Sequence, residues 1–195
     1  LRVWPTPGAP RRRRRDEAFE VCVVGHLREV KDPFRAALAA RELPAESRLR
    51  IRHAGAAIED GMAEAARAEQ AVNPRYRWLG GLPRWKTRRL MASSHLMVLS
   101  SHLEGGANTI SEALVDHVPV VASRIPGSIG LLGARYPGYF PVGDTRALAD
   151  LLWRAESDPR FYAKLKAWCS RLVPVFDPAR ERAGWRRLLR ELRVL

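Results

Sequence analysis

Two glutamates, Glu104 and Glu112, stand on either side of a glycine pair and of the expected start of a helix. Gly105 and Gly106 carry no Cβ, so a ligand could approach the backbone closely there. The helix expected over residues 108–116 would begin directly after them, and the free N–H groups of a helix N-terminus favour anions. The segment therefore predicts an anion-binding site with a carboxylate on each side. A nucleotide sugar, which carries hydroxyl groups at both ends of a pyrophosphate, fits that description.

Short apolar runs alternate with helical patterns along most of the chain. The expected strands are residues 19–24, 49–54, 76–79, 95–100 and 118–122. The expected helices are residues 58–73, 84–92, 108–116 and 145–157, one from residue 32 or 33 to 41, and a tail that Pro174 and Pro178 interrupt. Strands that alternate with helices pair in parallel through right-handed crossovers. The pattern predicts an α/β fold, a Rossmann-like doubly wound parallel sheet with helices on both faces.

The expected sheet also predicts where the site lies. In doubly wound sheets, ligands bind beyond the carboxyl ends of the strands. We therefore expect the loops after Val24, Leu79, Ser100 and Ala122 to meet at one edge of the sheet and to form the site.

The start of the chain differs in composition from the rest. Residues 1–19 contain Pro5, Pro7, Pro10 and a run of arginines at positions 11–15, which is typical of an extended linker because prolines cannot join a sheet and like charges repel. Residues 20–195 are long enough for one core and are expected to form a single nucleotide-sugar-binding domain with a helical tail.

The net charge of +13 favours polyanions, but most Lys and Arg residues are spread among carboxylates, without a basic stripe interleaved with aromatics. Nucleic-acid binding is therefore not expected. The sequence contains no uncharged apolar run of about 18 residues and no apolar segment at its start, which predicts no membrane span and a cytoplasmic protein. Cys22 and Cys169 lack partners at zinc or redox spacing, so buried free thiols are expected.

The segment around the two glutamates resembles the E-x7-E signature of retaining GT-B-fold glycosyltransferases, those of family 4 or the glycogen synthase-like group 1. Ser100-Ser101 stands where that family has Pro-Ser, and residues 118–122 stand where it has x-Pro-Val-Val-Ala. The resemblance implies a C-terminal, donor-binding domain in which Glu104 contacts the donor sugar and Glu112 holds the ribose hydroxyls of a UDP-sugar. The backbone after Glu104 would lie beside the sugar and the phosphates.

Two further segments resemble the same family. Residues 24–32 are similar to its V-G-R-L-x-x-x-K-G loop, whose Arg and Lys grip the donor pyrophosphate. Lys31 occupies the Lys position, but His26 replaces the Arg and Asp32 replaces the last Gly, so Arg28 is a candidate substitute. Residues 124–133, with Gly127, are similar to a glycine-bearing loop that approaches the phosphates. The resemblance implies a catalytic group of Glu104, Lys31 and Arg28, and donor-binding residues Gly25, His26, Lys31, Glu104, Gly105, Gly106, Ala107, Asn108, Thr109, Glu112 and Gly127.

A narrower resemblance is to the selenosugar synthase (SenB) family of selenoneine biosynthesis. It is carried by the segments at residues 25–28, 31–33, 75–80, 104–108 and 130–133. This resemblance implies transfer of a sugar from UDP to selenophosphate. No DxD-like triplet is present, so we expect no metal and no cofactor, with Lys31, Arg28 and the helix start near Asn108 in place of a divalent ion. The GT-B pattern also implies a missing N-terminal acceptor domain.

Several alternatives remain open from the residues alone. The chain could be a non-catalytic nucleotide-sugar-binding module or, less in keeping with its motifs, a basic polyanion-binding protein. His26 could bind the donor, bind selenophosphate or only cap its loop. Tyr76 and Trp78 are expected to pack in the core or at the sheet edge. A solvated helix face is expected for the basic residues of the helix at 84–92, which are Arg84, Lys86, Arg88 and Arg89.

Overall fold

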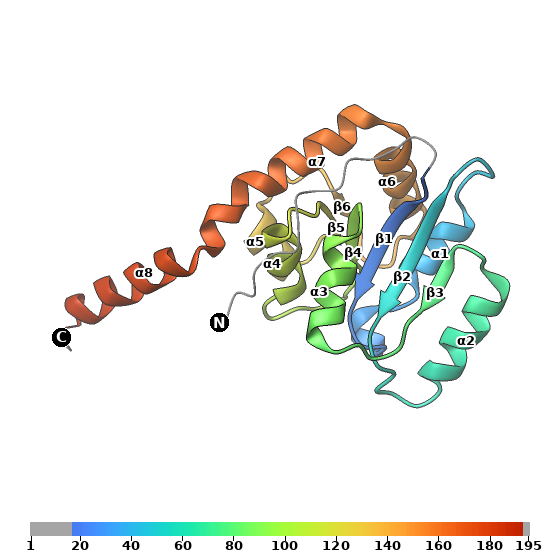
Figure 1. Cartoon of the computed structure of the whole chain (residues 1–195), viewed down its shortest axis with the longest axis horizontal. Helices are drawn as coiled ribbons and strands as arrows, with labels where there is room; N and C mark the ends of the chain where they lie inside the picture. The colour runs from blue at the N-terminus through green and yellow to red at the C-terminus, as the bar shows by residue number, and fades with distance from the viewer. Residues whose placement is uncertain (1–16, 193–195) are drawn as a thin grey trace.

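The computed structural model describes residues 17–192 (Figure 1). Within these residues six strands form one parallel sheet in the order β3-β2-β1-β4-β5-β6. The strands are β1 (Phe19–Val24), β2 (Leu49–Ala54), β3 (Tyr76–Trp78), β4 (Leu96–Leu99), β5 (Val120–Ser123) and β6 (Tyr139–Phe140). The strand order reverses between β1 and β4, so the crevice at their carboxyl ends is a topological switch point.

Helices cover both faces of the sheet. They are α1 (Arg35–Arg41), α2 (Met62–Val72), α3 (Arg84–Ala92), α4 (Asn108–Val115), α5 (Pro126–Leu132), α6 (Thr145–Ser157), α7 (Pro159–Leu172) and α8 (Pro178–Glu191), with 3₁₀ turns η1 (Glu29–Lys31) and η2 (Val173–Phe176). Helix α1 packs against α6, whereas α3 and α5 pack against α4, and Figure 1 shows the two groups on opposite sides of the sheet. The predicted fold class is confirmed.

The core explains why the central strands are continuously apolar. All four residues of β4 and of β5 are buried, since helices cover both faces. In β1, Val21 pairs with Ile51 of β2 on one side and with Leu96 of β4 on the other. Residues next to a helix also fix where it begins. The Asp144 carboxylate accepts from the N–H of Ala147 and so caps the start of α6. Local sequence and core packing therefore agree along the sheet.

Two elements were not expected from the sequence. Residues 124–133 were interpreted as a glycine-bearing loop, but Pro126–Leu132 forms helix α5, in which Pro126 stands in the first turn. The two-residue strand β6 was also missed. Burial of Leu132 and Ser128 outweighs the low helix propensity of the glycines. Strand β5 begins at Val120 rather than at residue 118, although the Pro119 carbonyl still accepts from Met97 N.

The linker predicted over residues 1–19 lies outside the described residues up to position 16. Phe19, at its end, was also the first residue of the expected strand; it begins β1 and is buried.

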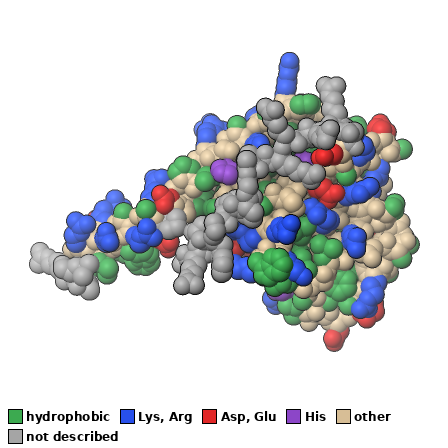
Figure 2. Space-filling view, in the orientation of Figure 1, with side chains coloured by type: hydrophobic (Ala, Val, Ile, Leu, Met, Phe, Trp, Pro, Cys, Tyr) green, Lys and Arg blue, Asp and Glu red, His purple; other side chains and the backbone are tan. Residues whose placement is uncertain are grey.

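The two cysteines are buried free thiols as predicted, and burial raises the pKa of Cys22 to about 11. No helix among residues 17–192 is long and apolar enough to cross a membrane. In Figure 2, basic side chains are scattered over the visible face and along α8, with acidic ones among them.

The segment at residues 75–78 holds the edge of the sheet in place. The Arg75 guanidinium donates to the carbonyl of Ala40 in the last turn of α1 and to three carbonyls of the turn that follows, those of Leu43, Pro44 and Ser47. The Tyr76 hydroxyl lies 3.1 Å from His53 Nδ1, and Trp78 Nε1 donates to the Gly55 carbonyl at 2.9 Å. Tyr76 and Trp78 therefore pack as predicted.

Candidate functional site

A cavity of about 450 Å³ opens at the carboxyl ends of β1, β2 and β4, where the strand order reverses. We call it the carboxyl-edge pocket. Eight of the predicted donor-binding residues line it: Gly25, His26, Lys31, Glu104, Gly106, Asn108, Thr109 and Glu112. Four predicted residues are not among its lining, namely Arg28, Gly105, Ala107 and Gly127. Two glutamates, a lysine and the N-terminus of α4 therefore meet in one cavity.

Lys31 and Glu104 form an ion pair at the centre of this group. Lys31 Nζ lies 2.6 Å from Glu104 Oε1, and the Ser101 hydroxyl donates to the same oxygen at 2.7 Å. The Glu104 side chain is mostly buried, whereas that of Lys31 is about a third exposed. The two groups are 73 positions apart in the sequence, with three strands between them, so only the folded sheet brings them together. A bound anion could replace Glu104 as the partner of Lys31, and ligand hydroxyl groups could replace Lys31 as the partner of Glu104.

The loop that carries Lys31 is tied to the end of β4. The Ser100 hydroxyl lies 3.1 Å from the Lys31 carbonyl and 2.8 Å from the Asp32 carbonyl, and His102 N donates to the Val30 carbonyl. Asp32 has φ 46° and ψ 57°, in the left-handed region. That conformation explains why a glycine suits this position in the resembled family, and Asp is among the few other residues that adopt it readily.

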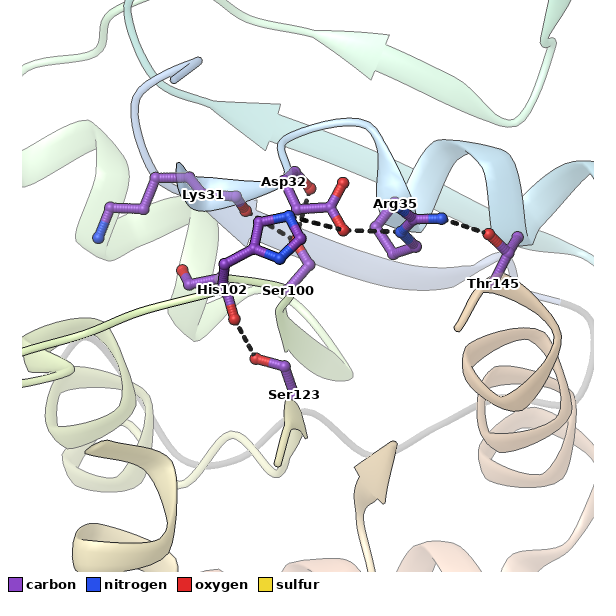
Figure 3. A network of polar contacts seen from close by, with 8 residues as sticks. Lys31, Asp32, Arg35, Ser100, His102, Ser123 and Thr145 are labelled. Carbon is purple, nitrogen blue, oxygen red and sulfur yellow. Dashed lines mark hydrogen bonds and ion pairs between the residues drawn. The ribbon is translucent and has the colours of Figure 1, made fainter. Parts of the chain in front are cut away.

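Figure 3 shows a polar network behind this loop, with the Lys31 side chain pointing away from it. The Asp32 carboxylate accepts from Arg35 Nε at 2.7 Å, and Arg35 Nη1 donates to the Thr145 hydroxyl at 2.7 Å. His102 Nε2 lies 3.9 Å from Asp32 Oδ2. The network joins the Lys31 loop to the first residue of α6. Sequence reasoning missed it, because Arg35 and Thr145 are 110 positions apart.

The loop that carries Glu104 is supported from below. The Ser123 hydroxyl, at the end of β5, donates to the Ser101 carbonyl at 2.6 Å. A Cβ on Gly127 would lie 2.6 Å from the Glu104 carbonyl oxygen, which is too close for an unmoved loop. Gly127 was predicted to approach the phosphates, but it lies against the Glu104 backbone, outside the pocket lining. Its lack of a side chain serves the packing of α5 against this loop.

Glu112 belongs to an ion-pair ladder between α3 and α4. Arg84 Nη2 lies 3.3 Å from Glu112 Oε1, and Arg88 Nη2 lies 2.5 Å from Asp116 Oδ1. Burial raises the pKa of the Asp116 carboxyl, which the Arg88 charge partly offsets. The expectation of a solvated basic face is therefore wrong for Arg88, which is mostly buried. Arg84 is exposed as expected, although it also lines the pocket. The i, i+4 spacing of the two arginines and of the two carboxylates was a usable signal.

His26 lies in the carboxyl-edge pocket, whereas Arg28 lies outside it. His26 lines the pocket, and its Nδ1 accepts from the Ala56 N–H at 3.1 Å, so the ring at least caps the neighbouring loop. The Arg28 side chain is half exposed, and its Nε lies 3.8 Å from Glu59 Oε1. Of the cations predicted to clamp the pyrophosphate, the pocket therefore contains Lys31 but not Arg28.

The pocket also contains a histidine that sequence reasoning missed. His53, at the end of β2, is buried, and its Nε2 lies 3.0 Å from the Gly25 carbonyl. Burial lowers the pKa of His53 to about 4, so the ring is neutral at pH 7. Because a carbonyl only accepts, Nε2 carries the proton and Nδ1 accepts from the Tyr76 hydroxyl. Next to it, Gly55 approaches the Gly25 carbonyl so closely that a Cβ would lie 1.8 Å away.

Among residues 17–192 no three His, Cys, Asp or Glu side chains are grouped as metal ligands.

The fold and the pocket define a Rossmann-like domain with a charged ligand site at the switch point of its sheet. The chain belongs to the family of glycosyl transferases group 1, which its sequence matches over residues 9–168. This confirms the family-level prediction. No curated protein matches the sequence.

Solved structures with the same fold are glycosyltransferases and related bacterial proteins. HepE of Anabaena, in complex with UDP and glucose, is 20% identical with a TM-score of 0.71 over 83% of this chain and 44% of its own. TarM of S. aureus, in complex with UDP among other ligands, is 16% identical with a TM-score of 0.73 over 95% of this chain and 38% of its own. The pneumococcal O-GlcNAc transferase GtfA, with UDP and GlcNAc, is 20% identical with a TM-score of 0.71 over 89% and 35%. The chain thus spans less than half the length of these proteins.

Proposed function

We propose that the chain is the donor-binding half of a retaining glycosyltransferase that uses a UDP-sugar. The observation that carries this proposal is the meeting of Glu104, Glu112 and Lys31 around the α4 N-terminus in one pocket. The helix start offers N–H groups to an anion, and the two carboxylates offer acceptors to hydroxyls on either side. Family membership and the UDP bound to neighbours such as HepE and GtfA support the same ligand class.

Within this proposal each residue has a defined role. Glu104 holds the donor sugar, Glu112 holds the ribose hydroxyls, and Lys31 leaves Glu104 to bind the pyrophosphate. The backbone from Gly105 to Asn108, with Thr109, lies beside the sugar and the phosphates. Arg28 could add a second catalytic cation only by leaving Glu59, so Lys31 is the principal one.

The reaction breaks the bond between the anomeric carbon and the β-phosphate oxygen, and UDP leaves with the electron pair. A new bond from the acceptor to the anomeric carbon forms with retention of configuration. Lys31 and the α4 N–H groups offset the charge that develops on UDP, so fixed electrostatics would supply much of the rate. We propose that this arrangement takes the place of a metal ion.

Two more specific proposals concern the identity of the acceptor and the need for a second domain. The resemblance to selenosugar synthases favours selenophosphate, whose anionic charge suits the basic chain. Its selenium would bond to the anomeric carbon as UDP leaves, and water would then cleave the Se–P bond to release phosphate and the selenosugar. Acceptor binding would require an N-terminal domain, since the chain spans 44% or less of the matched proteins. We place the reaction in the cytoplasm, where UDP-sugars are made.

The test is calorimetric titration of the chain with UDP and with UDP-N-acetylglucosamine, beside a Glu112→Ala variant. Saturable binding by the parent chain that weakens about 10-fold or more in the variant would support the donor site, because a charged acceptor is lost. Equal binding by both proteins, or no binding by the parent chain, would contradict it.

A donor-binding module without turnover is the second candidate. It is favoured by the location of the whole pocket within residues 23–112 of this one chain. UDP-sugar binding without hydrolysis or transfer, even after an acceptor half is supplied, would establish it. Polyanion binding has weaker support, because Figure 2 shows basic groups dispersed over the visible face.

A further inference from the structure

Helices α3 and α4 lie side by side and carry opposite charges at matching intervals (Figure 1). Arg84 and Arg88 are four positions apart on α3, so they share one face of that helix. Glu112 on α4 and Asp116, which directly follows α4, are also four positions apart. The outer pair, Arg84 and Glu112, lines the carboxyl-edge pocket. The inner pair, Arg88 and Asp116, lies behind it.

The two pairs differ in burial. The Arg84 side chain is 58% exposed, so its pair with Glu112 is weak and can be exchanged with solvent or ligand. The Asp116 side chain is fully buried, and Asp116 Oδ2 has no hydrogen-bond partner. Breaking such a buried pair leaves an unpaired charge at a large cost, so Arg88 is fixed in place by Asp116.

Arg88 also lies beside Glu112 without blocking it. Arg88 Nη1 is 4.0 Å from Glu112 Oε1, which is beyond hydrogen-bonding distance but close enough for its charge to act. Arg88 therefore leaves the Glu112 oxygens available to accept from hydroxyl groups, while its fixed charge attracts the carboxylate from one side.

We propose that Arg88, anchored on Asp116, is a positioning residue whose fixed charge orients the Glu112 carboxylate toward the ribose hydroxyls of the donor. The inference rests on the proposed donor site and adds a residue pair that lies outside its three sequence motifs. Arg84 is the displaceable partner of Glu112, and Arg88 is the permanent one.

The test compares the affinities of the full chain for UDP and for 2′-deoxy-UDP. If Glu112 holds the ribose hydroxyls, the parent chain should favour UDP by about 10-fold, the value of one charge-assisted hydrogen bond. Arg88→Met should reduce this ratio toward one, as Glu112→Gln should. A general packing defect would weaken both ligands together and leave the ratio unchanged.

Arg88→Met leaves Asp116 buried without a partner, so the double variant Arg88→Met with Asp116→Asn is made as well. It removes both charges and should fold with the same reduced ratio. The matched control is Arg89→Met, which removes the same charge from an exposed position on the same helix and should keep the ratio of the parent chain.

The combination of Arg88→Met with Glu112→Gln shows whether one residue acts through the other. We expect no further fall in the ratio when Arg88→Met is added to Glu112→Gln. An unchanged ratio in a folded Arg88 variant, beside a reduced one in Glu112→Gln, would overturn this inference alone. An unchanged ratio in Glu112→Gln itself would overturn the proposed donor site.

Discussion

Lys31 and Glu104 neutralise each other in the carboxyl-edge pocket, although the proposed reaction assigns them to different parts of the donor. The Lys31 side chain is about a third exposed, and Glu104 also accepts from the Ser101 hydroxyl, so the lysine can change partners without leaving the carboxylate unbonded. A pyrophosphate offers Lys31 more negative charge than one carboxylate does. In the absence of the donor, the ion pair would thus hold Lys31 and Glu104 close to the positions in which they bind it.

Replacing Lys31 with Ala should weaken UDP binding about 10-fold to 100-fold, because one charge-assisted contact to the phosphates is lost. The thermal midpoint should change little, since the Glu104 carboxylate keeps its hydrogen bond from the Ser101 hydroxyl. Calorimetric titration with UDP measures the affinity, and Lys86→Ala on the exposed face of α3 is the control. Parent-like affinity in Lys31→Ala would remove Lys31 from the donor site.

His53 should make the stability depend on pH. Its folded pKa of about 4 lies below the ordinary 6.5, so the unfolded chain binds the proton first as the pH falls. The contribution is complete above pH 6.5 and is lost toward pH 4, up to about 3 kcal/mol. His53→Gln, which can still donate to the Gly25 carbonyl, should show a flatter profile in urea unfolding between pH 7 and 4.5. Parallel profiles would show that another group controls the acid sensitivity.

The sequence revealed the charged residues of the site but not the groups that hold them. Glu104, Glu112 and Lys31 were predicted because glycines, a strand end and a helix start surround them. His53 and Arg88 were missed, because an isolated histidine in a strand and an arginine on a basic helix have no local pattern. Their roles depend on contacts to Gly25 and Asp116, across 28 residues in each case.

At the scale of elements, α5 shows where local patterns are insufficient. Its sequence reads Pro-Gly-Ser-Ile-Gly-Leu-Leu, and the two glycines favoured a loop. The helix forms because two of its own residues, Ser128 and Leu132, are buried and because Gly127 allows close contact with the Glu104 loop. In contrast, β1 and α6 were predicted with their observed bounds because no glycine interrupts their apolar patterns.

The two glycines of α5 should respond oppositely to alanine. Gly127→Ala places a methyl group against the Glu104 carbonyl and should cost about 1–3 kcal/mol while weakening UDP binding. Gly130→Ala meets no atom within 4 Å and should stabilise the helix by about 0.5–1 kcal/mol. Urea unfolding and UDP titration of both variants provide the comparison. Equal stability of the two proteins would contradict the close contact seen at Gly127.

At the scale of the whole molecule, the described residues form one packed body from which α8 extends (Figure 1). Helix α7 buries Phe161, Leu165 and Cys169 in the core, whereas α8 leaves Trp185 and Leu188 exposed. The core of the domain therefore ends with α7 and the turn that follows it.

Removing residues 178–195 should leave the thermal midpoint and the UDP affinity of the chain nearly unchanged, because the described side chains of α8 are not part of the core. Ending the chain after Ser157 should prevent folding, since α7 and its three buried side chains are lost. Calorimetric melting of both shortened chains measures this difference. A fall of many degrees in the first would show that α8 contributes to the core after all.

The four carbonyl contacts of Arg75 have a consequence for proteolysis. The turn at residues 42–48 contains charged residues on the surface and would ordinarily be a site of cleavage. One guanidinium ties its backbone down, so a protease would have to break several contacts before the turn could fit an active site. Loss of that side chain would leave the turn held at its far end by Glu156, which accepts from Ser47 and Arg48, and would open residues 42–46 to digestion between α1 and β2.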